Sequence, residues 1–286
     1  MIRKSINYWS LPGGLAGTLD PKEFLRLAKD HGFESAELAI GDTGSSLSVD
    51  ATQSECEDLV AAAQQLGLGL ESVASGLYWD RALASGDAGK RDQAKRDLER
   101  MIPIVQWLGA KTLLTIPGAV DVFFLPSFET QNYQSVWDRA VDGLKSVAPL
   151  AEERGVRLGI ENVWNKFLMS PVEMNLFLDS VGSPNVGSYF DVGNILPFGY
   201  PEQWIRILGQ RIVGVHFKDF RRSVGTADGF VDLLEGDVNW PEVMAALKEI
   251  NYDGPVVAEM IPLYARHPMV RVANTSRAMD VILGRA

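Results

Sequence analysis

Four residues that can bind a metal ion stand at the C-terminal ends of four short hydrophobic segments. Each segment, such as residues 186–190, is of the kind that a parallel strand buried on both faces shows. The four end residues are Glu161, Asp191, His216 and Glu259. Three carboxylates and one imidazole make an oxygen-rich set that suits Mn²⁺, Mg²⁺, Co²⁺ or Zn²⁺.

Each of these residues taken alone has an ordinary structural explanation. A single carboxylate at a strand end is more often a helix cap or half of an ion pair, and a single histidine is more often a core residue. Four such residues on consecutive strands, at the same level, are not explained in this way. Buried carboxylates without a counter-charge are costly, so a bound cation is the economical explanation. The sequence therefore predicts one divalent metal site.

The elements that must position these residues recur through the whole chain. A strand-like run followed by an amphipathic helical segment occurs eight times. The strands are predicted near 3–8, 34–40, 69–74, 111–116, 156–161, 186–191, 211–216 and 255–259, and the helices near 21–31, 53–66, 90–108, 133–154, 171–181, 201–208, 240–250 and 269–283. Strict alternation predicts parallel strands with helices outside, and eight units close a (β/α)₈ TIM barrel. We expect residues 1–286 to form one such domain.

Glycines mark where these helices are expected to end. A residue in the left-handed conformation commonly follows the last turn of a helix, and glycine adopts it most easily. The predicted positions are Gly32, Gly67, Gly109, Gly155, Gly182, Gly209 and Gly284, with Asn251 in the remaining gap.

The connections between elements differ in length according to their direction. Links from helix to strand are a few residues long, whereas the links from strand to helix are long, as at 117–132 and 217–239. Compact folds keep loops short unless the loops carry function. All the long links emerge from one end of the predicted barrel, the end at which such barrels keep their active sites.

The overall composition excludes several classes of protein. A net charge of −10 opposes non-specific binding to nucleic acid, which needs a surface that neutralises phosphates. No apolar run approaches the roughly 20 residues that a membrane span needs, and the N-terminus lacks the features of a signal peptide. The one cysteine, Cys56, fits a reducing compartment. We therefore expect a cytoplasmic protein with no membrane or nucleic-acid partner.

Short sequence motifs at the strand ends resemble those of a known superfamily. The segments are Gly-Ile-Glu161-Asn, Phe-Asp191-Val-Gly-Asn, Val-His216-Phe-Lys-Asp and Ala-Glu259-Met. They are similar to the sugar phosphate isomerase/epimerase superfamily, the xylose isomerase-like barrels that include ketose 3-epimerases, hydroxypyruvate isomerases, inosose dehydratases and endonuclease IV. The resemblance is strongest to the L-ribulose/L-xylulose 5-phosphate 3-epimerase branch. The sequence segments that carry it are 161–167, 189–194, 199–205 and 231–240.

The resemblance implies a reaction as well as a fold. Glu161, Asp191, His216 and Glu259 would bind one divalent metal, and the two glutamates would also act as acid and base on opposite faces of a sugar. The expected activity is 3-epimerisation of a ketose or ketose phosphate through a metal-bound enediolate. Two alternatives use the same metal site: a 1,2 aldose–ketose isomerase of the hydroxypyruvate type, and an inosose dehydratase-like lyase. The endonuclease branch needs many histidines, and this chain has three.

Further residues are expected to contact the substrate. The six candidates are Glu37, Asn162, Trp164, Asn194, Lys218 and Arg222. By the resemblance, ketose 3-epimerases place a histidine where this chain has Asn194 and an arginine where it has Arg222. Lys218 and Arg222 could hold a phosphate or form a solvated basic loop. Glu37 could support the site, reach a substrate hydroxyl or form a structural ion pair. A homo-oligomer, dimeric or tetrameric, is also expected.

Overall fold

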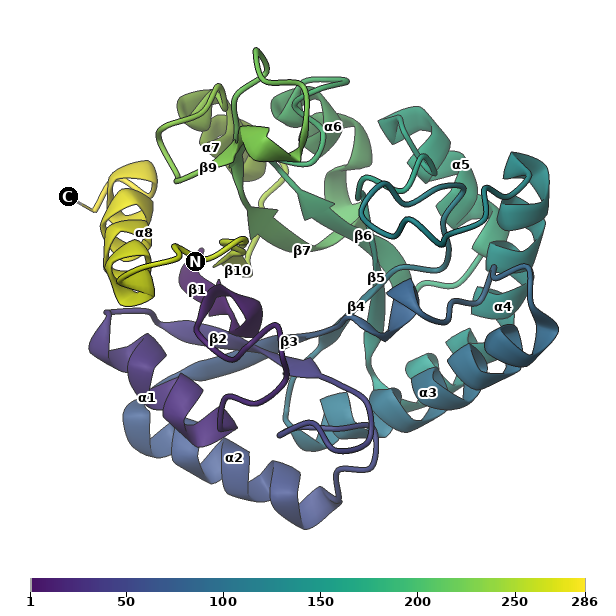
Figure 1. Ribbon diagram of the computed structural model, residues 1–286, viewed down its shortest axis with the longest axis horizontal. Helices are drawn as coiled ribbons and strands as arrows, with labels where there is room; N and C mark the ends of the chain where they lie inside the picture. Colours follow the sequence, from purple (N-terminus) through teal and green to yellow (C-terminus); the bar gives the residue numbers. More distant parts are fainter. Residues whose placement is uncertain (1, 286) are drawn as a thin grey trace.

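Eight parallel strands close into a barrel in the computed structural model, which describes residues 2–285 (Figure 1). The barrel strands are β1 (Arg3–Asn7), β2 (Ser35–Ile40), β3 (Gly69–Ser75), β4 (Thr112–Thr115), β5 (Arg157–Glu161), β6 (Val186–Asp191), β7 (Ile212–Phe217) and β10 (Pro255–Ala258). Each strand pairs with its neighbour in the chain, and β10 pairs with β1 to close the ring. The predicted (β/α)₈ fold is confirmed.

The helices form a ring around the strands (Figure 1). They are α1 (Pro21–Asp30), α2 (Gln53–Leu66), α3 (Ala88–Trp107), α4 (Tyr133–Arg154), α5 (Pro171–Val181), α6 (Pro201–Leu208), α7 (Trp240–Glu249) and α8 (Pro268–Ile282). Short polar side chains start most of them: Thr52, for example, accepts a hydrogen bond from the backbone N–H of Glu55 at the start of α2. All the predicted glycines and Asn251 have a positive φ, between 53° and 79°, where a helix ends, so the predicted helix ends are confirmed. Gly209 differs in having ψ of −127°, outside the left-handed helical region.

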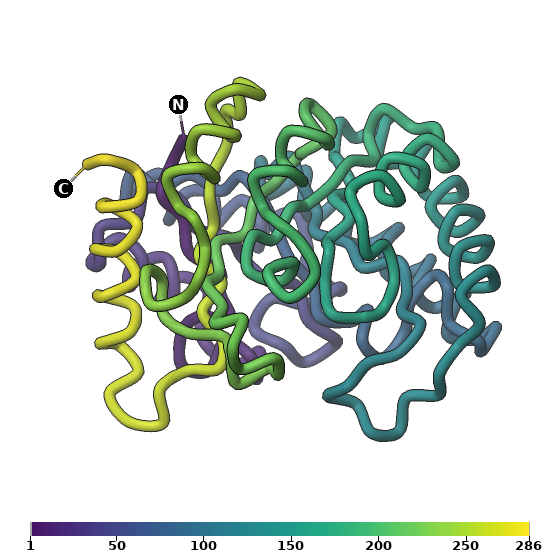
Figure 2. The backbone as a smooth tube through the Cα atoms, turned by 90° about the horizontal axis from the view of Figure 1, so that it is seen from above, coloured from purple at the N-terminus to yellow at the C-terminus, as the bar shows by residue number. Residues whose placement is uncertain are grey.

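The long strand-to-helix loops gather at one end of the barrel. Figure 2 shows the loops near 117–132 and 260–267 extending from the end opposite to the two chain termini. This is the C-terminal end of the parallel strands, as the sequence predicts. No helix among residues 2–285 is long and apolar enough to cross a bilayer.

The loop after β7 contains a small hairpin that the sequence did not predict. Strands β8 (Asp219–Phe220) and β9 (Phe230–Val231) pair antiparallel within it. The buried carboxylate of Asp219 holds the loop together, because it accepts hydrogen bonds from four donors. These are the backbone N–H groups of Phe220, Leu234 and Val238 and the indole N–H of Trp240. These hydrogen bonds join residues up to 21 positions apart in the chain, so local sequence patterns do not reveal them.

The barrel interior beneath the mouth is filled by Tyr189. Its register partners on the neighbouring strands are Glu161 on β5 and Gly214 on β7. A side chain at Gly214 would lie 2.5 Å from the tyrosine ring, so the position requires glycine. The buried ring forms a floor under the residues that end β5, β6 and β7.

Candidate metal centre

The four predicted metal ligands converge at the mouth of the barrel. Glu259 directly follows β10, and His216, Asp191 and Glu161 lie on β7, β6 and β5; these four strands are consecutive neighbours in the sheet. Each offers one donor atom, and these atoms all lie within 4.8 Å of one another. Asp191 and His216 are fully buried, and the two glutamates expose less than a tenth of their surface. Burial of three carboxylates in one place calls for compensating positive charge.

The donor atoms that face one another fit a divalent ion. Oε1 of Glu161, Oδ2 of Asp191, Nδ1 of His216 and Oε2 of Glu259 are buried, and none makes a hydrogen bond of regular geometry within the described residues. The ammonium of Lys218 lies against two of them, the oxygens of Asp191 and Glu259. Nδ1 lies 3.5, 3.8 and 3.5 Å from the oxygens of Glu161, Asp191 and Glu259. Ligand atoms about 2.0–2.2 Å from one ion lie roughly 3–3.5 Å apart. The buried cluster could therefore hold a divalent metal.

Glu37 lies directly behind His216, on the side away from this cluster. Its Oε1 is 2.8 Å from Nε2 of the histidine, so Nε2 carries the proton and Nδ1 faces the other three ligands. A carboxylate partner of this kind orients metal-binding histidines and selects their tautomer.

Three further donors fix the carboxylate of Glu37. Oε1 also accepts from Nδ2 of Asn7 at 2.7 Å, while Oε2 accepts from the hydroxyls of Ser72, at 2.5 Å, and Tyr189. With no exposed surface and four donors, Glu37 occupies a supporting position and not one open to a substrate hydroxyl. Sequence reasoning did not single out Tyr189. It stands two residues before Asp191, and the alternation of side chains along a strand would have placed it inside the barrel.

Weakening this support should weaken metal binding. We expect Glu37→Gln to lower metal affinity by about 10- to 100-fold, since an amide cannot accept from all four donors. Titration of the protein with Mn²⁺ or Co²⁺ measures the effect. Ser72→Ala, which removes one donor and leaves the carboxylate, is the matched control and should change affinity much less. Unchanged affinity in Glu37→Gln would show that His216 needs no partner to bind metal.

Lys218 lies against the same carboxylates. Its ammonium is 3.2 Å from Oδ2 of Asp191 and also contacts Oε2 of Glu259. The side chain is only 11% exposed, and it lies over the ring of Phe230 at 5.7 Å from the ring centroid. The lysine therefore belongs to the centre itself and not to the exposed basic loop that follows it.

The surroundings of Glu161 and Glu259 shift the pKa values of the two carboxyls in opposite directions. Burial raises the pKa of Glu161 above that of an ordinary glutamate. Burial would do the same at Glu259, but the positive charge of Lys218 and the contact with His216 outweigh it and lower the pKa of that carboxyl. Two carboxylates whose surroundings move their pKa values apart are suited to act as an acid and a base.

Asn162 and Asn194 hold Asp191 in place. The side-chain amide of Asn162 donates to the backbone carbonyl of Asp191 at 2.8 Å and accepts from its backbone N–H at 2.9 Å. The backbone N–H of Asn194 donates to Oδ1 of Asp191 at 2.8 Å, which leaves Oδ2 for a metal. Both asparagines also line a neighbouring cavity. Contact with a substrate there stays a prediction.

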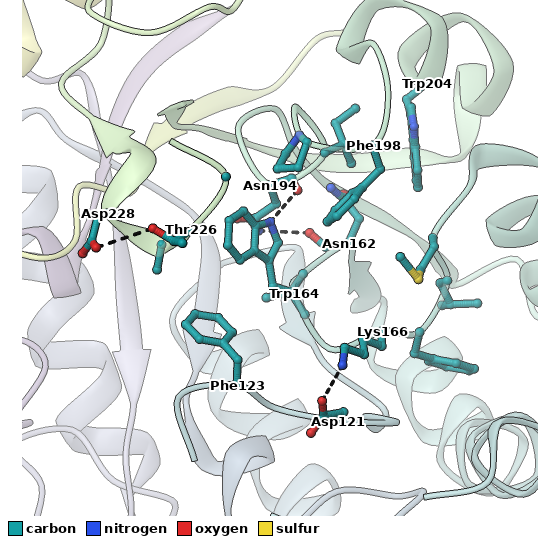
Figure 3. Close-up of a pocket in the computed structure, with 18 residues that line it drawn as sticks. Asp121, Phe123, Asn162, Trp164, Lys166, Asn194, Phe198, Trp204, Thr226 and Asp228 are labelled. Atoms are coloured by element: carbon teal, nitrogen blue, oxygen red, sulfur yellow. Dashed lines mark hydrogen bonds and ion pairs between the residues drawn. The ribbon is translucent and has the colours of Figure 1, made fainter. Parts of the chain in front are cut away.

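Trp164 is the centre of an aromatic group beside the site (Figure 3). Its indole N–H donates to the backbone carbonyl of Asn194, and its ring contacts those of Phe123, Phe198 and Phe230. These rings come from four different strand-to-helix loops. Trp164, Phe123 and Phe198 line a cavity with a volume of about 610 Å³, and none of the four candidate metal ligands lines it. It therefore lies beside the metal centre.

Arg222 lies exposed on the hairpin loop after β7. Its backbone N–H donates to Asp237, and its guanidinium lies over the ring of Tyr200, 5.1 Å from the centroid. No carboxylate among residues 2–285 forms an ion pair with that guanidinium. The neighbouring Arg221, by contrast, lies 3.6 Å from the carboxylate of Glu235.

Comparison with known proteins places this geometry in context. A family model described as a xylose isomerase-like TIM barrel matches residues 25–278. The L-ribulose-5-phosphate 3-epimerase UlaE of Salmonella paratyphi C is 28% identical over 255 residues, which cover 88% of this chain and 86% of that protein.

Solved structures match over the full barrel. A D-psicose 3-epimerase from Clostridium cellulolyticum H10 has a TM-score of 0.78 at 19% identity, covering 99% of each chain. An L-ribulose 3-epimerase has a TM-score of 0.79, also at 19% identity, and the match covers 99% of this chain and 95% of that one. These likenesses confirm the fold, and the curated relatives confirm the expected isomerase or epimerase class. The chain therefore belongs to the xylose isomerase-like TIM barrel family.

Proposed function

We propose that this protein is a divalent-metal-dependent 3-epimerase of a ketose or ketose phosphate. The observation that carries the proposal is the convergence of four buried donor atoms, from three carboxylates and one imidazole, at the barrel mouth. Glu161 and Glu259 stand at the two ends of the arc formed by β5, β6, β7 and β10, so a ligand bound between them meets one carboxylate on each side. The 3-epimerase names of the relatives support the same reaction.

The metal would be held by Glu161, Asp191, His216 and Glu259. A bound Mn²⁺, Co²⁺, Mg²⁺ or Zn²⁺ would polarise the carbonyl oxygen and the neighbouring hydroxyl oxygen of the sugar. Glu37 keeps the proton of His216 on Nε2, so that Nδ1 stays available as a ligand. Asn162 and Asn194 hold the carboxylate of Asp191 at the same point.

The two glutamates would then invert one carbon centre. One carboxylate takes the C3 proton, and the electron pair of that C–H bond moves to form a carbon–carbon double bond as the carbonyl oxygen gains negative charge. The other glutamate delivers a proton to the opposite face of C3, and the carbonyl forms again. The carboxyl that gained a proton and the one that lost it return to their starting states by exchange with solvent.

A phosphate on the substrate would be recognised at Arg222. Its guanidinium has no ion-pair partner among the described residues, and it lies over the ring of Tyr200. The acceptor oxygens of a phosphate match the donors of an arginine well. Lys218, expected from the sequence to share this task, lies inside the metal centre against Asp191 and Glu259 and not on the exposed loop that carries Arg222. We therefore assign the phosphate contact to Arg222 alone.

Replacing Arg222 with alanine tests that assignment. We expect KM for the phosphorylated ketose to rise much more than KM for the free ketose, since a charge-assisted contact is worth about 1.5–3 kcal/mol. Arg221→Ala is the matched control, because its guanidinium already pairs with Glu235. Steady-state kinetics on both substrates measure the difference. Equal effects on the two substrates would mean that Arg222 contacts the sugar or only supports the loop.

The function itself is tested by isotope exchange. A panel of ketopentoses, ketohexoses and their 5- or 6-phosphates is incubated with the metal-loaded protein in D₂O. The proposal expects deuterium at C3 together with appearance of the C3 epimer. Label at C1 or C2 would instead indicate a 1,2-isomerase, and loss of water from the substrate would indicate a lyase.

A further inference from the structure

Lys218 occupies the inward-facing position just above the metal centre. Side chains alternate along β7 and its continuation, so Gly214, His216 and Lys218 all face the barrel interior. Two residues of extended chain span about 6.6 Å, which places Lys218 one level closer to the mouth than His216. A substrate entering through the mouth therefore meets Lys218 before it meets the floor of the site.

The chain makes room for this lysine at a specific point. Gly193, in the loop after β6, packs against Lys218, and a side chain there would lie 2.6 Å from Cβ of the lysine and 2.9 Å from its backbone carbonyl carbon. Real Cβ atoms essentially never approach so closely. Phe230 covers the ammonium from the other side. The lysine is thus built into the centre and is not a solvated surface charge.

Lys218 contacts two of the atoms that a metal would take. Its ammonium lies against Oδ2 of Asp191 and Oε2 of Glu259, both of which face the other candidate ligands. A metal ion that took these two oxygens would compete with the ammonium for their lone pairs and weaken its contacts with both carboxylates. The N–H groups of Lys218 would then be available to a substrate oxygen that arrives from the mouth.

We propose that Lys218 is a catalytic residue that donates a hydrogen bond to the substrate oxygen that becomes negative. The proposal rests on the epimerase function argued above. When a glutamate removes the C3 proton, the negative charge of that carboxylate moves to the carbonyl oxygen of the sugar. Lys218 keeps all its protons throughout, so no proton is gained or lost by the lysine. Together with a divalent ion, the ammonium would balance the three negative charges of Glu161, Asp191 and Glu259.

Replacing Lys218 with methionine tests the proposal. With metal saturating, we expect kcat to fall on the order of 100-fold, as for loss of one donor to an oxyanion, while KM changes little. Metal affinity should stay equal or increase, because a competing cation is gone. Lys218→Arg, which keeps the charge in a larger group, should recover part of kcat. Wild-type kcat in Lys218→Met would overturn the proposal, and so would a loss of activity fully explained by lost metal.

Inhibitor binding separates a catalytic role from a structural one. The probes are a trihydroxybutyrohydroxamate, whose planar group resembles an enediolate, and the pentitol made by reducing a ketopentose, which does not. Lys218→Met should weaken the hydroxamate on the order of 10-fold or more and leave the pentitol nearly unchanged. Equal loss for both probes would mean that the lysine only shapes the site. Gly193→Ala should give the same pattern as Lys218→Met if it displaces the ammonium.

Failure of this inference is distinguishable from failure of the function. If the epimerase function is wrong, the wild-type protein puts no deuterium at C3 of any ketose in the panel. If only the role of Lys218 is wrong, the wild type labels C3 and Lys218→Met labels it at the same rate.

Discussion

Glu161→Gln and Glu259→Gln should each abolish net inversion at C3 while leaving exchange at one face. In a two-base epimerase each glutamate serves one face of the carbon, so the remaining carboxylate still removes the proton from one epimer. We expect complementary washout in D₂O: one variant exchanges only the first epimer, and the other variant exchanges only the second. The loss of net turnover should reach at least the 10²- to 10⁴-fold typical of a missing acid or base.

Metal content is the control that makes this result interpretable. Glutamine keeps one oxygen that can bind metal, so both variants should load an ion, and elemental analysis shows whether they do. A 1,2-isomerase would show one indispensable glutamate and another that serves the metal alone. If both variants hold metal and neither exchanges either epimer, the two glutamates do not work as independent bases.

Removal of the metal should abolish activity and destabilise the fold. Three buried carboxylates face one another at the barrel mouth, and Lys218 alone does not balance them. A ligand that binds only the folded state at 1,000 times its Kd stabilises that state by about 4.1 kcal/mol. For a chain of this size, chelation should lower Tm by on the order of 10 °C. Adding Mn²⁺ or Co²⁺ should restore both activity and Tm.

His216→Ala provides the matched control for chelation. This variant loses the one nitrogen ligand, so the chelator should shift its Tm far less than that of the wild type. Differential scanning fluorimetry with and without chelator measures both proteins under the same conditions. Full activity in a preparation that elemental analysis shows to be free of divalent metal would refute the metal dependence.

Local patterns in the sequence were sufficient for the barrel. The alternation of apolar runs and amphipathic segments depends on side chains that are close in the chain, and the helix ends depend on single residues such as Gly155 and Asn251. All of these were observed where expected. The four metal-capable residues could also be predicted as a group. The C-terminal ends of parallel strands in a closed barrel share one mouth, so residues at those ends must meet.

Contacts between distant strands were decided only by the tertiary structure. Glu37 and His216 are 179 residues apart, and Tyr189 reaches the same carboxylate from 152 residues away. The sequence left Glu37 with three possible roles, because nothing local shows which side chains cross the interior. Closure of the ring brings β2 opposite β6 and β7, and only then does the carboxylate lie behind the histidine.

The sequence likewise could not predict that the side chain of Lys218 points toward the metal centre. A lysine followed closely by Arg221 and Arg222 has the composition of a solvated basic loop, and the pattern allowed a phosphate site there. The ammonium turns inward because Gly193 leaves space for its stem and Asp219 clamps the next residues into a hairpin. Both causes come from loops that meet only in the folded barrel. The sequence thus determined which groups reach the mouth, whereas packing between loops determined which of them face the metal centre.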